Sequence, residues 1–120
     1  MKLQIEDKGS YKLVKIENER LDTLLAPELK GELFSLIQTQ GNKNIVLDIS
    51  NCSFCDSSGL SAILVGNRLC ENSSGIFIVT GIQAYVEKLI KISLLDSVLT
   101  IAKDTDEVES LLKKRAEMGG

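Results

Sequence analysis

The sequence predicts a single α/β domain built on a mixed β-sheet, and three observations lead to this class. The chain has 120 residues, a length typical of one domain with its own hydrophobic core. Short apolar runs of strand type alternate with longer segments in which apolar residues recur every three or four positions. A hairpin pattern precedes this alternation, so we expect one antiparallel strand pair beside strands that helical crossovers make parallel.

The first two predicted elements form a β-hairpin, and a helix follows them. Apolar and polar residues alternate over 3–5, and 11–16 has the pattern of the partner strand after a short turn. From 23 to 40 the apolar period becomes helical. Pro27 suits the first turn of this helix, and Gly41 stands just beyond its end.

The rest of the chain alternates between strands and helices. The run 44–49 is apolar at nearly every position, which is typical of a central strand. After it we expect a helix from Asp56 to about Glu71, a strand over 76–79, a helix over 82–93, a short strand over 97–101 and a last helix from about Asp104. The predicted order is β-β-α-β-α-β-α-β-α, with four to five strands and about four helices.

The helical stripes are narrow, so we expect the helices all to cover one side or the edges of the sheet. No linker divides the chain, and we therefore expect one domain over 1–120. Its core spans about 3–112, and its tail is frayed over 116–120.

Composition excludes several classes of function. Lys and Arg number 14 against 17 Asp and Glu, so the formal charge is −3, and there is no Trp. Nucleic-acid binders need a basic surface and stacking aromatic residues, so we expect no nucleic-acid partner. No stretch approaches the roughly 20 apolar residues that cross a bilayer. We therefore expect a cytoplasmic protein without membrane insertion.

Three cysteines suit a reducing compartment better than a disulfide scaffold, because their number is odd and small. Cys52 and Cys55 have CxxC spacing, which leaves a redox pair open, since a helix N-terminus lowers the pKa of a thiol. The simpler reading is two small buried side chains. A closed zinc site needs four ligands, and the chain offers one further Cys and no His. We expect no metal and no cofactor.

The most informative segment is Asp56-Ser57-Ser58-Gly59, which lies where a strand leads into a helix. Asp and Ser are preferred N-caps, which explains Asp56 and one serine. The second serine and Gly59 need another reason, because Gly inside a helix costs about 1 kcal/mol relative to Ala. A small residue there would let another surface approach the backbone closely.

A phosphate on Ser58 would change a binding surface more than it would change the fold. It adds about −1.5 to −2 charges, which a helix N-terminus stabilises by roughly 0.3–1 kcal/mol. The nearby Asp56 carboxylate opposes this gain, so the two effects nearly cancel. A partner docked over Ser58 would meet the new charge without compensation. The segment therefore indicates a protein switch.

The chain lacks the residue patterns that common catalytic sites need, so we expect no enzyme and no catalytic residue. The chain has no His to activate a serine, and no Ser-x-x-Lys surrounds Ser57 or Ser58. It also lacks the Gly-Lys-Ser/Thr of a phosphate-binding loop.

These residues resemble a known family. The strand 45–50 followed by Phe54-Cys55-Asp56-Ser57-Ser58-Gly59-Leu60 is similar to the signature of STAS domains, in particular of bacterial anti-sigma factor antagonists. Supporting segments occur in the right order, at 20–22 with 26–29, at 75–79 and at 89–96. The resemblance covers about residues 3–112. Ser93-Leu94-Leu95 departs from it, because the family usually has Thr-Gly-Leu there.

The resemblance implies a phosphorylation-controlled binding protein. In that family the unmodified protein binds an anti-sigma factor that is also a serine kinase, and a sigma factor is thereby freed. Phosphorylation, here at Ser58, abolishes binding, and a serine phosphatase restores it. The resemblance puts Asp22 beside Ser58 and implies a docking surface formed by Asp22, Asp56, Ser57, Gly59, Leu60 and Ser61. The alternative is a STAS scaffold subunit of another signalling or transporter-associated complex.

Overall fold

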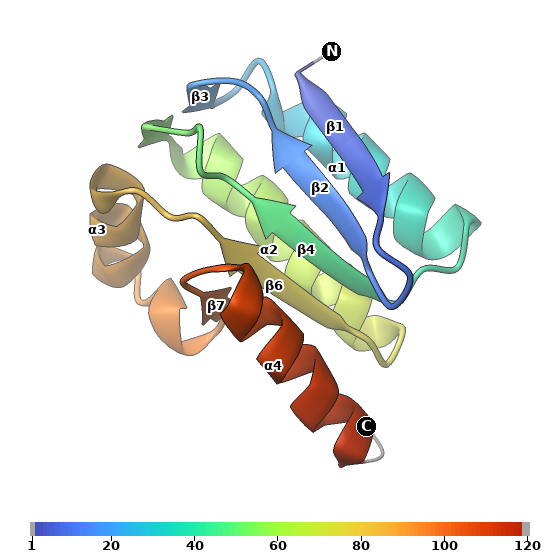
Figure 1. Cartoon of the computed structure of the whole chain (residues 1–120). Coiled ribbons are helices and arrows are strands. Elements are labelled where there is room, and N and C mark those ends of the chain that lie inside the picture. Colours follow the sequence, from blue (N-terminus) through green and yellow to red (C-terminus); the bar gives the residue numbers. More distant parts are fainter. Residues whose placement is uncertain (1, 119–120) are drawn as a thin grey trace.

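A five-stranded mixed sheet forms the centre of the computed structural model, which describes residues 2–118 (Figure 1). The strands occur in the order β1-β2-β4-β6-β7. The β1–β2 hairpin is antiparallel, and each of the other neighbouring pairs is parallel. The predicted mixed sheet is therefore confirmed. The bounds are β1 Leu3–Asp7, β2 Lys12–Ile16, β4 Asn44–Asp48, β6 Ile76–Thr80 and β7 Thr100–Ala102.

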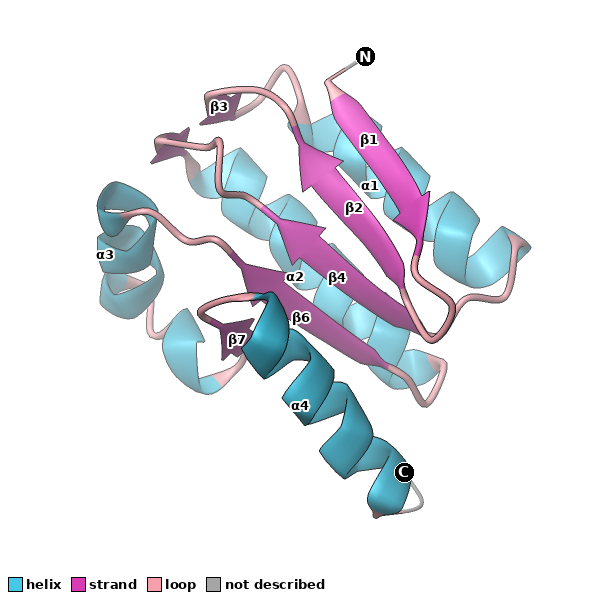
Figure 2. Cartoon of the chain, viewed as in Figure 1, coloured by secondary structure: helices cyan, strands magenta, loops and turns pink. Residues whose placement is uncertain are grey.

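The four expected helices are present among the described residues, and they lie on both faces of the sheet (Figure 2). Their bounds are α1 Ala26–Phe34, α2 Ser57–Asn72, α3 Ala84–Ile92 and α4 Thr105–Glu117. A π-helical turn, Ser35–Thr39, extends α1, and a 3-10 turn, Leu95–Ser97, follows α3. Helices α1 and α2 cover one face, while α4 crosses the other (Figure 1). Within the described residues no helix is long and apolar enough to cross a membrane.

The position of α4 corrects the expectation that all helices cover one side or the edges of the sheet. In the central strands, Ile45 and Phe77 belong to the core cluster beneath α1 and α2. Their neighbours Val46 and Ile78 belong to a second cluster, together with Val108 of α4. Successive residues of a strand point to opposite faces, so an unbroken apolar run requires cover on both.

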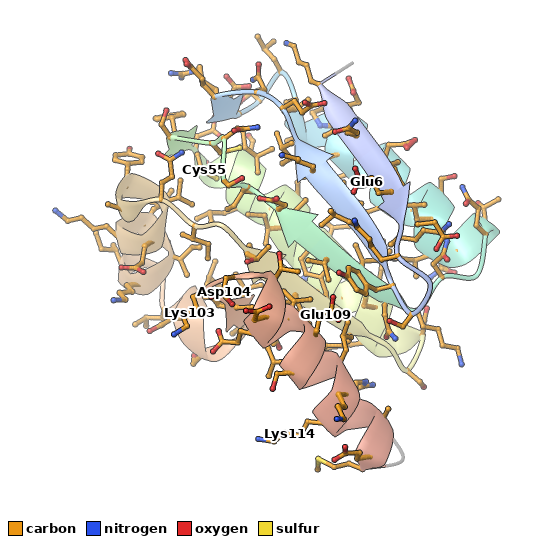
Figure 3. All side chains as sticks on the ribbon, viewed as in Figure 1. Glu6, Cys55, Lys103, Asp104, Glu109 and Lys114 are labelled. Carbon is orange, nitrogen blue, oxygen red and sulfur yellow. The ribbon has the colours of Figure 1, made fainter. Side chains whose placement is uncertain are left out.

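The end of α4 overlaps the tail for which we expect fraying. The helix begins at an N-cap, Asp104, whose Oδ1 accepts the N–H of Glu107 at 2.9 Å (Figure 3). It extends through Glu117, so its last residues fall within the predicted frayed tail over 116–120. Arg115, just before that tail, connects the helix to the loop before β6, because its guanidinium donates to the carbonyl of Ser74 at 3.1 Å. The last two residues lie outside the described part of the chain.

Two very short strands were not predicted. β3 (Arg20–Leu21) and β5 (Phe54–Cys55) pair in parallel, apart from the main sheet. The Asp56 N–H extends this pairing by donating to the carbonyl of Leu21 at 3.3 Å. A strand of two residues is too short to show the alternation of apolar and polar residues by which strands are predicted from a sequence. The pair brings the segment before α1 against the start of α2.

Candidate functional site at the start of helix α2

Asp56 caps helix α2 as its residue type predicts. Its backbone is extended, with φ −109° and ψ −173°, and its Oδ1 accepts the N–H of Gly59 at 2.9 Å. The backbone carbonyl of Asp56 accepts the N–H of Leu60 at 3.0 Å. The carboxylate is thus held in one orientation by the helix, and its second oxygen is directed to other partners.

Three oxygen atoms meet beside this cap. The hydroxyl oxygens of Ser58 and Thr23 lie 3.2 Å apart, and the Thr23 hydroxyl donates to Asp56 Oδ2 at 3.4 Å. Ser58 is half-buried, whereas Thr23 is exposed. Thr23 was not among the predicted site residues. It comes 35 residues before Ser58, and only the pairing of β3 with β5 brings the two together.

Asp22 shapes the loop that carries Thr23. Its Oδ2 accepts the Arg20 Nε–H at 3.2 Å, and its Oδ1 accepts the N–H of Leu24 at 3.1 Å. The hydrogen bond from Arg20 lowers the pKa of Asp22. The resemblance put Asp22 beside Ser58, and the side chain within hydrogen-bond distance of Ser58 is that of the next residue, Thr23.

Gly59 and Leu60 lie beneath the site. A Cβ atom on Gly59 would meet the Leu21 carbonyl oxygen and would lie 2.7 Å from Cys55 Sγ. This internal contact requires glycine at position 59, whereas we expected the missing side chain to admit another surface. Leu60 is only 7% exposed and belongs to the main core cluster.

A shallow groove of about 310 Å³ borders the site between α2 and the turn after α3. Leu94, in that turn, is 75% exposed and has a left-handed backbone with φ +60°. Leu24, next to Thr23, is 85% exposed. The site therefore has exposed apolar side chains in the loops around it. The groove is lined by Ser57, Leu60, Ser61, Leu64, Val65, Arg68, Ser93 and Leu95.

A stack of three side chains joins β3, β5 and α3. The Arg20 guanidinium lies 4.0 Å from the centre of the Phe54 ring, within cation–π range. Phe54 and Tyr85 stack with ring centres 5.6 Å apart and an angle of 20° between their planes. Because Arg20 also pairs with Asp22, the stack holds the Thr23 loop in place and leaves Tyr85 half exposed.

The cysteines lack the character of reactive thiols. Burial raises the pKa of Cys52 to about 11 and that of Cys55 to about 12, and the charges of Asp48 and Asp56 add to the respective shifts. Burial likewise raises the pKa of Cys70 to about 12. Cys55 lies on β5, at the end of the molecule where α3 packs (Figure 3). Across residues 2–118, no group of three Cys, Asp or Glu side chains is placed to hold a metal ion.

We expect iodoacetamide at pH 8 to label all three thiols at least about 100-fold more slowly in the folded protein than in urea. A rise of two pKa units lowers the thiolate fraction about 100-fold, and only the thiolate reacts. Mass spectrometry of timed samples measures both rates. Fast labelling of Cys52 or Cys55 in the folded protein would contradict this and favour the redox pair.

The fold and the site together define an α/β domain that presents a hydroxyl group at a capped helix start. Residues 2–108 match the STAS domain family, and the chain belongs to this family. It is 27% identical over 101 residues to a protein of Paenibacillus polymyxa named anti-sigma F factor antagonist. The aligned region covers 84% of this chain and 86% of that protein.

Two solved structures illustrate the similarity of the fold. RsbS of Moorella thermoacetica, solved as a variant with serine replaced by glutamate, has a TM-score of 0.81 and 26% identity, over 98% of this chain and 99% of that one. The phosphorylated form of the cell fate determinant SpoIIAA from Bacillus has a TM-score of 0.71 and 19% identity, over 91% of this chain and 98% of that one.

Proposed function

We propose that this protein is an anti-sigma factor antagonist controlled by phosphorylation of Ser58. In its unphosphorylated form it binds an anti-sigma factor that is also a serine kinase, and this binding frees a sigma factor. The kinase transfers a phosphoryl group to Ser58 and the complex dissociates, after which a serine phosphatase restores the binding form. The protein itself catalyses no reaction.

The observation that carries this proposal is the position of Ser58. Its hydroxyl lies in the first turn of α2, beside the cap formed by Asp56, and it is half-buried within hydrogen-bond distance of Thr23. The helix N-terminus would stabilise a phosphate there, and the Asp56 carboxylate would destabilise it. Because the two effects oppose each other, the fold should survive modification. The name of the Paenibacillus polymyxa relative supports the kind of partner.

We further propose that the partner docks over the start of α2. Ser57 is exposed and Ser61 half-buried, and both line the groove beside α2. Asp22 and Asp56 would complete the polar part of this surface. Gly59 and Leu60 are buried, so they would contribute by shaping the surface from below. The exposed Leu24 and Leu94 side chains offer apolar contacts around it.

The test begins with capture of partners by the unmodified full-length chain from a lysate of its native host. The bound fraction is then given ATP, and phosphorylated residues of the chain are mapped by mass spectrometry. We expect a serine kinase in this fraction and phosphate on Ser58. Ser58→Ala should accept none, while the control Ser57→Ala should still be phosphorylated.

Absence of phosphate at Ser58, with a captured assembly that contains no serine kinase, would overturn the proposal. The same result would favour the scaffold alternative, in which the start of α2 docks without being modified. Phosphate on Ser57 in place of Ser58 would overturn the assignment of the acceptor.

A further inference from the structure

We propose that Thr23 is a positioning residue that orients the Ser58 hydroxyl for phosphoryl transfer. This inference rests on the proposed function and adds a residue to it. Thr23 lies on the loop between β3 and α1, so its hydroxyl reaches Ser58 from a segment distant in the sequence.

Counting protons decides the direction of the hydrogen bonds. An ionised carboxylate only accepts, and a hydroxyl has one proton to donate. The Thr23 hydroxyl donates to Asp56 Oδ2 at 3.4 Å, which uses its proton. The 3.2 Å contact between Thr23 and Ser58 is then a hydrogen bond in which Ser58 donates. The Ser58 proton is directed toward Thr23, and the oxygen lone pairs are left free for an incoming phosphoryl group.

Both ends of this chain of hydrogen bonds are held by other contacts. At one end, the helix cap fixes Asp56, because its Oδ1 already accepts the Gly59 N–H at 2.9 Å. At the other end, Asp22 fixes the backbone around Thr23 by accepting the Leu24 N–H at 3.1 Å. The Thr23 hydroxyl is exposed, yet its position is determined by the two segments that carry these contacts.

The orientation matters because phosphoryl transfer depends mainly on placing the reacting atoms. The Ser58 oxygen forms a bond to the γ-phosphorus of ATP while the bond from that phosphorus to the leaving ADP oxygen breaks. The Ser58 hydroxyl proton is released to water as the new bond forms, and the role of Thr23 is to hold the Ser58 oxygen in the orientation for attack. The products are phosphoserine, ADP and one proton.

The experiment compares Thr23→Val, which keeps the shape and removes the hydroxyl, with Thr23→Ser, which keeps the hydroxyl. The kinase found by capture phosphorylates each full-length protein with ATP, and kcat and KM are measured for the protein substrate. We expect Thr23→Val to lower kcat by about 10- to 100-fold with little change in KM. Thr23→Ser should remain within about threefold of the unaltered protein.

A kcat for Thr23→Val equal to that of the unaltered protein would overturn the inference. So would an equal loss in Thr23→Ser, or a loss confined to KM, which would make Thr23 a docking contact. These outcomes differ from failure of the proposed function itself, in which the unaltered protein receives no phosphate at Ser58. The thermal unfolding of both variants is measured alongside, and we expect it to stay unchanged because Thr23 is exposed.

Discussion

Replacing Gly59 by alanine is expected to lower the free energy of unfolding by about 3 kcal/mol, at the upper end of the range for overpacked cores. The added Cβ would meet the Leu21 carbonyl oxygen and lie 2.9 Å from Leu21 Cγ. Neither atom can move away easily. Leu21 is 1% exposed, and its backbone is held in the pairing of β3 with β5.

Gly31 provides the matched control, because it is also a helical glycine. A Cβ atom there would meet nothing within 4 Å. Gly31→Ala in α1 should therefore raise the free energy of unfolding by up to about 1 kcal/mol through helix propensity alone. Urea denaturation of the two variants measures both effects. A similar increase in the free energy of unfolding for the two variants would contradict the close packing of β3 against α2.

The Gly59 variant also connects packing with the site. Room for a methyl group would require moving β3 and the Cys55 side chain away from α2, and the loop that carries Thr23 follows β3 directly. Under the inference about Thr23, the fraction of Gly59→Ala that remains folded should accept phosphate on Ser58 more slowly than Gly31→Ala does.

Under the proposed function, Ser58→Asp is expected to weaken binding to the anti-sigma factor partner by at least about 100-fold, equivalent to roughly 2.7 kcal/mol. The new carboxylate would be buried under the partner without a compensating charge. In the free protein the helix N-terminus favours this charge and Asp56 opposes it. The midpoint of thermal unfolding should accordingly change by only a few degrees.

Ser110→Asp is the control for net charge. Ser110 is exposed on α4, which covers the other face of the sheet. The Ser110→Asp substitution adds the same charge far from the start of α2, so the affinity for the purified partner should stay unchanged. Isothermal titration calorimetry measures the affinity of both variants for the purified partner. Equal affinity for the unaltered protein and Ser58→Asp would contradict docking over Ser58, and equal losses in both variants would point to a general charge effect.

Local patterns were sufficient for the main elements and for part of the site. The alternation in the hairpin and the apolar runs of β4 and β6 predicted the mixed sheet, because they report directly on which side chains are buried. Asp56 was predicted as a cap because its oxygen can reach an N–H only three residues ahead, and the structure places it so. The family resemblance, carried by the same segment, was confirmed over residues 2–108.

Three features depend on residues far apart in the sequence. The cover of α4 on the second sheet face follows from pairing Val46 and Ile78 across neighbouring strands, so that their side chains form one surface. The need for glycine at position 59 comes from Leu21, and the hydrogen-bond partner of Ser58 is Thr23. Residue type and spacing describe what one segment can do alone. The contacts that complete this site are made between two segments that meet only when β3 pairs with β5.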